Sequence, residues 1–207
     1  WKGYQGVANG TQALVGSWTP FNDPTTVTWQ GSPCFVINNN LNEYDPQAGG
    51  TNVKKIPTGY TKSTQINCAQ NNYNSSRLTY DLLINNNNCL LTFNYAMILQ
   101  EANHGGYIDP YFRIEVLALD ALENPVGLID PCATFEVPGR TPVPAGWGET
   151  GDVMWQNWRQ ISMNLTSYLS QKVRISIIIS DCDAGGHWAY GYFVGRVGPS
   201  VLTVNAC

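Results

Sequence analysis

The stretch VRISIIIS, residues 173–180, decides the fold of this chain. Apolar side chains occupy every second position, at Val173, Ile175, Ile177 and Ile179. A period of two places them on one face of a β-strand, because successive side chains of a strand point to opposite faces. A loop at 181–187 joins this strand to a second alternating stretch at 188–194. The sequence therefore predicts two β-strands linked by a loop rich in acidic residues and glycine.

The same alternation recurs along the rest of the chain. It predicts strands at 91–99, 112–116 and 161–165, and weaker ones at 27–30, 34–37, 77–84 and 201–204. Helical character is confined to a turn near 166–171, and the Pro- and Gly-rich region 131–152 is interpreted as a long excursion between strands. Strands without intervening helices predict an all-β chain, a two-sheet antiparallel β-sandwich of jelly-roll type. A length of 207 residues fits one domain over 1–207.

The chain is poor in charge. Charged residues make up 13% of it and the formal net charge is -4, so the basic surface that nucleic acids require is lacking. The longest apolar stretch, near 175–179, falls far short of the ~20 residues of a membrane span. We expect neither a nucleic-acid partner nor membrane insertion by this chain.

Six cysteines indicate an oxidising compartment, because thiols seldom accumulate in this number in a reducing cytosol. An extracellular location, secreted or at a cell surface, is therefore predicted. No pair has the C-x2-C spacing of a zinc site, so disulfides are favoured over metal thiolates. Six cysteines can pair in many ways, and the sequence does not choose among them. They are Cys34, Cys68, Cys89, Cys132, Cys182 and Cys207.

The two histidines of the chain lie in Gly-containing loops with carboxylates nearby. The first group is Glu101, His104 and Asp109, and the second is Asp181, Asp183 and His187. Such groups suit general acid–base chemistry, and carboxylates from loops suit Ca²⁺. The opposing interpretation is that they fix loop backbones at strand ends. That interpretation is favoured over catalysis, whereas a structural Ca²⁺ ion stays an open hypothesis and no other cofactor is required.

Aromatic residues are the second candidate for ligand contact, because exposed rings can stack on the apolar faces of sugars. Trp188, Tyr190 and Tyr192 share one face of a predicted strand and are expected to pack in the core. Trp147, between two glycines in a loop, is expected to be an exposed ring. The predicted binding residues are Glu101, His104, Asp109, Trp147, Asp181, Asp183 and His187.

Several spaced segments carry a resemblance to a known group of modules. They are residues 91–101 (LTFNYAMILQE), His104, 110–116 (PYFRIEV), Trp155, Trp158, 164–169 (NLTSYL), 181–182 and 186–192 (GHWAYGY). Over about residues 78–195 the chain resembles the extracellular jelly-roll modules of Bacteroidetes secreted, surface-adhesin and gliding-motility proteins, which are similar to the MAM domains of animal receptors. The resemblance implies a binding or structural part of a larger protein with neighbouring modules, rather than an enzyme.

Three functions are therefore weighed. The first is a non-catalytic adhesion module of a bacterial surface protein, which binds a glycan or a protein. The alternative is a secreted hydrolase acting on polysaccharide or peptide, with Glu101, His104, Asp181 or His187 in its site; it lacks the G-x-S-x-G motif of a serine nucleophile. The third is a purely structural spacer without a ligand.

Overall fold

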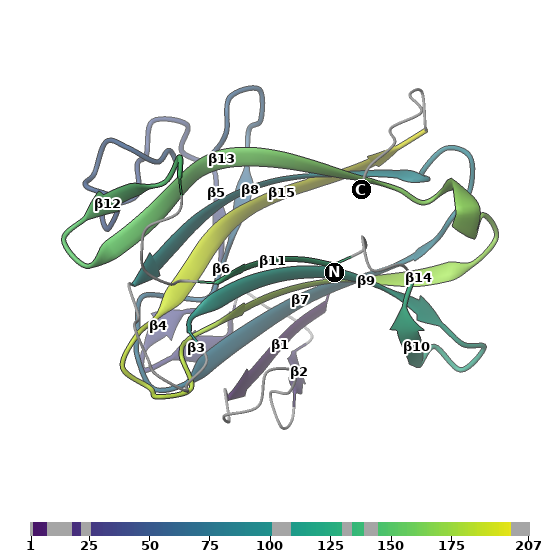
Figure 1. Ribbon diagram of the computed structural model, residues 1–207, viewed down its shortest axis with the longest axis horizontal. Coiled ribbons are helices and arrows are strands. Elements are labelled where there is room, and N and C mark those ends of the chain that lie inside the picture. The colour runs from purple at the N-terminus through teal and green to yellow at the C-terminus, as the bar shows by residue number, and fades with distance from the viewer. Residues whose placement is uncertain are drawn as a thin grey trace.

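A computed structural model describes residues 2–7, 18–21, 26–100, 109–129, 134–138 and 145–199. Two antiparallel sheets lie face to face, as Figure 1 shows. The predicted all-β sandwich is confirmed. No helix in the described part of the chain has the length and apolar character needed to cross a membrane.

The first sheet has the strand order β10-β9-β14-β7-β1-β2, and β11 also pairs with β9. Its strands are β1 (Lys2–Val7), β2 (Thr19–Phe21), β7 (Asn74–Leu83), β9 (Tyr111–Leu119), β10 (Pro125–Leu128), β11 (Thr134–Pro138) and β14 (Lys172–Ser180). The stretch that opens the sequence argument, β14, lies in the middle of this sheet between β7 and β9. Its central place explains why it carries the strongest apolar signal.

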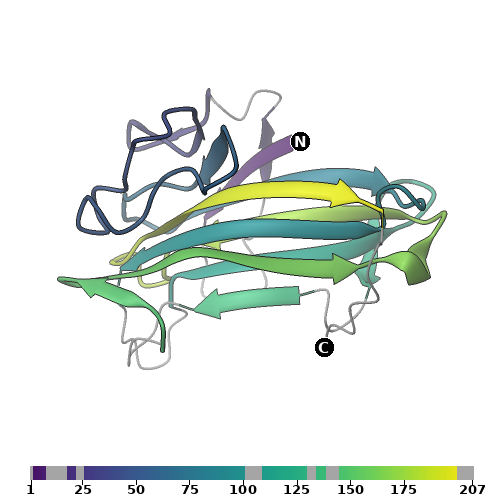
Figure 2. The ribbon, with the colours of Figure 1, turned by 90° about the horizontal axis from the view of Figure 1, so that it is seen from above.

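The second sheet has the order β12-β13-β8-β15-β6-β5. Its strands are β5 (Phe35–Asn38), β6 (Ser63–Ile66), β8 (Leu90–Gln100), β12 (Gly148–Thr150), β13 (Val153–Asn164) and β15 (Ala189–Gly198). A small ribbon of β3 (Thr28–Trp29) and β4 (Ser32–Pro33) and a 3-10 turn, η3 (Thr166–Tyr168), complete the elements. Figure 2, seen from above, shows β8, β13 and β15 running side by side across the molecule.

The main core fills the space between the sheets. Alternate residues of β8 face alternate residues of β9 and β14, as the sequence period requires. The rings of Tyr95 on β8 and Phe112 on β9 stack with centroids 5.2 Å apart and so join the two sheets. Core members from these strands are Leu91, Phe93, Tyr95, Met97, Leu99, Phe112, Ile114, Val116, Val173, Ile175, Ile177 and Ile179.

The stronger strand predictions are confirmed in β8, β9, β13, β14 and β15, and the weaker ones at 27–30, 34–37 and 77–84 each overlap a strand. The prediction at 201–204 lies outside the described residues. The interpretation of 131–152 as one long excursion between strands is only partly right, because the short strands β11 and β12 lie within it. Both are short edge strands, and short edges carry little alternating signal. β1 gave no signal because glycines, Gly3 and Gly6, occupy its buried positions.

Candidate functional site

The loop of residues 181–188 crosses from β14 in one sheet to β15 in the other. Asp181 is fully buried at its start. One carboxylate oxygen accepts hydrogen bonds from Asn67 Nδ2 at 3.2 Å and from the backbone N–H of Ala189 at 3.3 Å. The other accepts from the backbone N–H of Asn74 at 2.9 Å. Asp181 therefore ties a strand of each sheet to the loop, as expected for a residue that fixes loop backbone.

Burial raises the pKa of the Asp181 carboxyl well above its ordinary value, and the three donors act in the opposite direction. A carboxyl whose oxygens are committed to internal donors and sealed from solvent cannot reach a substrate. The geometry therefore argues against Asp181 as an acid or base in a surface site.

The rest of this loop closes on itself. The backbone N–H of Cys182 donates to the carbonyl oxygen of His187 at 3.0 Å, and the N–H of His187 donates to Cys182 Sγ at 3.2 Å. Gly185, with φ +74°, packs directly on Tyr73, where an added Cβ would lie 2.6 Å from the ring. His187 and Asp183 are half-buried in this turn.

The other predicted binding residues do not form one site. Glu101 and His104 lie outside the described residues, and Asp109 is half-buried just before β9. The expectation that Trp147 is an exposed ring is wrong, because it is half-buried and packs against the core between the sheets. Burying a large apolar ring is favourable even in a glycine-flanked turn. Within the described ranges, no three His, Cys, Asp or Glu side chains converge to hold a metal ion. Calcium binding through Asp181, Asp183 and Glu101 stays a prediction.

A second apolar cluster lies on the outer face of the second sheet. The connection between β5 and β6, residues 39–62, is here named the cover segment. Its residues Ala48 and Val53 pack on outward-facing side chains of β8, β13 and β15. Figures 1 and 2 show the segment in dark blue on the outer side of this sheet. The expected burial of Trp188, Tyr190 and Tyr192 is confirmed, and what buries them is this segment.

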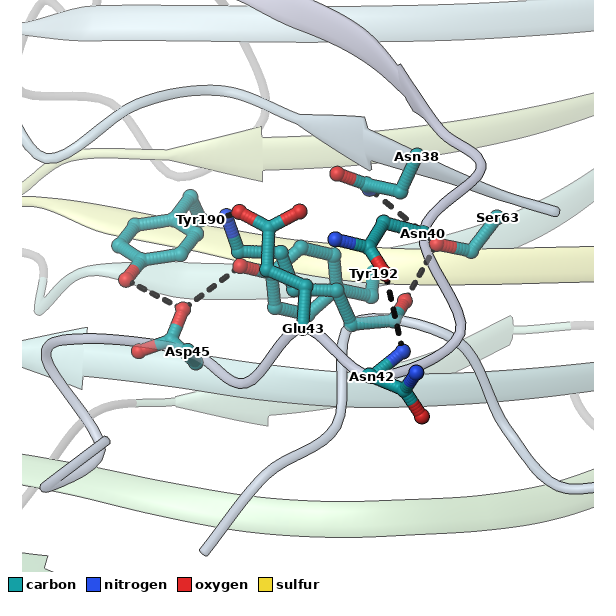
Figure 3. Close-up of polar contacts among 9 residues, drawn as sticks. Asn38, Asn40, Asn42, Glu43, Asp45, Ser63, Tyr190 and Tyr192 are labelled. Carbon is teal, nitrogen blue, oxygen red and sulfur yellow. Dashed lines mark hydrogen bonds and ion pairs between the residues drawn. The ribbon is translucent and has the colours of Figure 1, made fainter. Parts of the chain in front are cut away.

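Asp45 anchors the cover segment. The hydroxyls of Tyr190 and Tyr192 both donate to Asp45 Oδ2 at 2.7 Å, as Figure 3 shows. The backbone N–H of Ala48 donates to Oδ1 at 2.8 Å. Burial and the charge of Asp45 raise the pKa of both tyrosines, so the hydroxyls keep their protons and serve as donors. A fully buried carboxylate thus joins the cover segment to β15.

A pocket of about 510 Å³ opens between the cover segment and strands β8 and β13. Amides, hydroxyls and two aromatic rings dominate its lining. The lining residues are Tyr44, Thr51, Asn52, Lys54, Ile56, Pro57, Thr58, Asn94, Asn157 and Trp158. Among the described residues, no carboxylate belongs to this lining. Lys54 is the one cation of the described lining, and its Nζ lies 5.6 Å from the centroid of the Tyr44 ring.

A β-bulge in β13 carries two of the residues that line the pocket. Gln156 pairs with Met97 and Arg159 with Tyr95, so two residues of β13 stand opposite one residue of β8. The two are Asn157 and Trp158, and a bulge of this kind re-aims the side chains it carries. Both reach the cover segment: Asn157 Nδ2 donates to the carbonyl oxygen of Asn52 at 3.0 Å, and Trp158 Nε1 to that of Lys54 at 2.7 Å.

None of the ten lining residues was predicted as a binding residue from the sequence. One signal was present: Trp155 and Trp158 are three residues apart, which places them on opposite faces of a regular strand. Both pack against the outer cluster, and the bulge between them makes this possible. The strand predicted at 161–165 begins after both residues, so this spacing indicates a bulge only once β13 is seen to start at Val153. The residues of the cover segment carry no comparable signal.

The sequence matches no protein family and no curated protein. The matches among solved structures include three that cover most of this chain. The enzymatically active domain of tailspike protein 4 from bacteriophage CBA120 has 8% identity and a TM-score of 0.40, and the match covers 79% of this chain and 17% of that one. TmCBM61 in complex with β-1,4-galactotriose has 7% identity and a TM-score of 0.35, covering 79% and 82%. CBM28, a carbohydrate-binding module specific for non-crystalline cellulose, has 8% identity and a TM-score of 0.37, covering 83% and 91%.

Similarity at this level concerns the sandwich arrangement alone, and it does not identify what this chain binds. The fold and the pocket define a class: a β-sandwich that carries a lateral pocket on the outer face of one sheet. The resemblance to MAM-like modules of Bacteroidetes stays a prediction.

Proposed function

We propose that this chain is a non-catalytic glycan-binding module and that its ligand occupies the pocket beneath the cover segment. The observation that carries the proposal is the lining, which combines amide and hydroxyl groups with Tyr44 and Trp158. Amides and hydroxyls can both donate and accept hydrogen bonds, as the hydroxyls of sugars require. Aromatic rings offer apolar surface for the C–H faces of a sugar ring. A volume of about 510 Å³ is within the ordinary size of small-ligand sites.

The lining favours binding over hydrolysis. Glycoside hydrolases generally use two carboxyl groups placed about the scissile bond. The described lining contributes none, and Asp181, one of the acids of the hydrolase hypothesis, is enclosed by internal donors. The hypothesis of a spacer without a ligand does not account for a polar pocket built on a bulge. Binding without turnover is the function that fits this geometry.

We further infer an extracellular setting, secreted or at a bacterial cell surface, in a protein with neighbouring modules. The support is the six cysteines, the low charge and the resemblance to surface modules. In this setting the module contributes adhesion to a glycan, and a protein ligand is the competing partner.

A glycan array followed by titration calorimetry tests the proposal. Trp158→Ala should weaken binding more than tenfold, because it removes the larger of the two aromatic rings in the lining. Thr58→Ala should weaken it about 2- to 12-fold, the usual effect of one hydrogen bond. Thr61→Ala is the matched control, since Thr61 is also an exposed threonine of the same segment and lies outside the lining. Its affinity should equal that of the unaltered protein.

Circular dichroism of each variant must show the native spectrum. An array without signal, or a glycan whose affinity is unchanged in Trp158→Ala, would exclude this pocket as a glycan site. Release of reducing ends from a bound polysaccharide, abolished in His187→Ala with folding intact, would replace the binding module with the hydrolase.

A further inference from the structure

Two cysteines lie near the two ends of the cover segment, beside the paired strands β5 and β6 that it connects. Cys34 directly precedes β5, and Cys68 follows β6 by two residues. The strands pair with Phe35 opposite Ile66, and the N–H of Asn67 donates to the carbonyl oxygen of Cys34 at 2.7 Å. Asn67 has φ +66°, a left-handed conformation that Asn tolerates and that ends the extended strand. The Sγ atoms of the two cysteines lie 4.0 Å apart.

We propose that Cys34 and Cys68 form a disulfide that closes the cover segment at its base. Each thiol gives up its hydrogen, one S–S bond forms, and a low-molecular-weight disulfide such as oxidised glutathione accepts the two hydrogens as two thiols. The bond is about 2 Å long. Rotation of the two side chains has to bring the sulfurs about 2 Å closer, on backbones that the strand pairing already holds side by side.

The surroundings of the pair support this assignment. Both side chains are buried, and the same amide nitrogen, Asn74 Nδ2, lies 3.6 Å from Cys34 Sγ and 3.8 Å from Cys68 Sγ. The other two described cysteines have different neighbours. Cys182 Sγ contacts the backbone N–H of His187, and Cys89 Sγ contacts the carbonyl oxygen of Asn86 at 3.7 Å.

The bond would enclose the whole cover segment. Residues 35–67 form the closed loop, and seven of the ten pocket-lining residues lie in it. Asp45 holds this loop at its middle, whereas the disulfide would hold its two ends. A loop of this length loses much of its freedom in the unfolded chain when it is cross-linked. On the chain-entropy relation, the unfolding equilibrium constant falls by about 10²- to 10³-fold.

Tryptic digestion of the oxidised, alkylated protein tests the pairing directly. Cleavage after Lys2, Lys54, Lys62 and Arg77 gives the peptides 3–54 and 63–77, each with a single cysteine. The expected product is the two peptides joined, lighter by two hydrogen atoms than their sum, and separated when dithiothreitol is added before digestion. Recovery of both peptides alkylated at cysteine would overturn the proposal. So would either peptide joined to another cysteine peptide.

A stability measurement gives an independent readout. Dithiothreitol should raise the unfolding equilibrium constant of the unaltered protein by about 10²-fold or more. The double variant Cys34→Ala, Cys68→Ala should respond to the reductant much less, because it lacks this bond. An equal response in both proteins would refute the pairing. The pairing does not depend on a glycan ligand, so an array without signal leaves it standing.

Discussion

Replacing Asp45 with Ala should detach the cover segment from β15. Asp45 accepts from Tyr190 and Tyr192 at 2.7 Å each and from the N–H of Ala48 at 2.8 Å. The change removes all three acceptor contacts and leaves two phenol hydroxyls in a buried site without this acceptor.

The magnitude follows from those contacts. An orphaned buried donor costs about 1–3 kcal/mol, so the two hydroxyls and the N–H of Ala48 amount to about 3–9 kcal/mol. Removal of the carboxylate also removes its desolvation penalty, which offsets part of this loss. We expect the free energy of unfolding to fall by about 3 kcal/mol.

Urea unfolding followed by tryptophan fluorescence measures this free energy, with the m-value as a check on two-state behaviour. The informative comparison is a double-mutant cycle with Tyr190→Phe and Tyr192→Phe. Once both hydroxyls are absent, Asp45→Ala has no donors to orphan on these rings. Its effect in that background should shrink by about 2 kcal/mol.

Two results would refute the reasoning. One is a loss below about 1 kcal/mol for Asp45→Ala, which would mean that water or another group satisfies the hydroxyls. The other is an equal loss in the Phe background, which would mean that Asp45 acts without the tyrosines. Hydrogen exchange should also locate the change, with faster exchange at the N–H groups of Asp45 and Gly50, which bond within the cover segment.

Two further predictions concern the sheets. Arg174 donates to both oxygens of Asp81 at 2.7 Å and lowers the pKa of that carboxyl. The pKa of Asp81 is about 3.9 in the unfolded chain and lower in the folded protein, so the ion pair stabilises the fold above about pH 3.9 and this stabilisation is lost as the pH falls through the folded pKa. In urea titrations at acid pH, Asp81→Asn should therefore lose less stability than the unaltered protein as the pH falls. An equal loss of stability in both proteins would contradict this. In thermal melts, Gly191→Ala should lower stability by about 1–3 kcal/mol, because its Cβ would lie 2.8 Å from the carbonyl oxygen of Ala96. Gly198→Ala on the same strand is the control: its Cβ meets nothing within 4 Å, so it should be nearly neutral.

The sequence did not reach the pocket, whose lining contains none of the predicted binding residues. It did identify Asp181 as a notable residue, and the loop-fixing interpretation agrees with its contacts. Its partners could not be predicted, because Asn67 and Asn74 are 114 and 107 positions away in the chain. Trp147 was misplaced for a similar reason: two flanking glycines indicate a turn, but they do not say against which surface the turn packs.

The sequence by itself determined the long central strands and the two-sheet class, because the alternation of apolar side chains is a local property that β8 and β14 display within a single run of residues. Only the tertiary structure decided where a ligand can bind. The pocket needs the cover segment, Asn94 on β8 and the bulge on β13 in one place, and strand pairing over long chain separations brings them there. Amides and hydroxyls carry no periodic signal in sequence, so their convergence becomes visible only when the sheet and its cover are assembled.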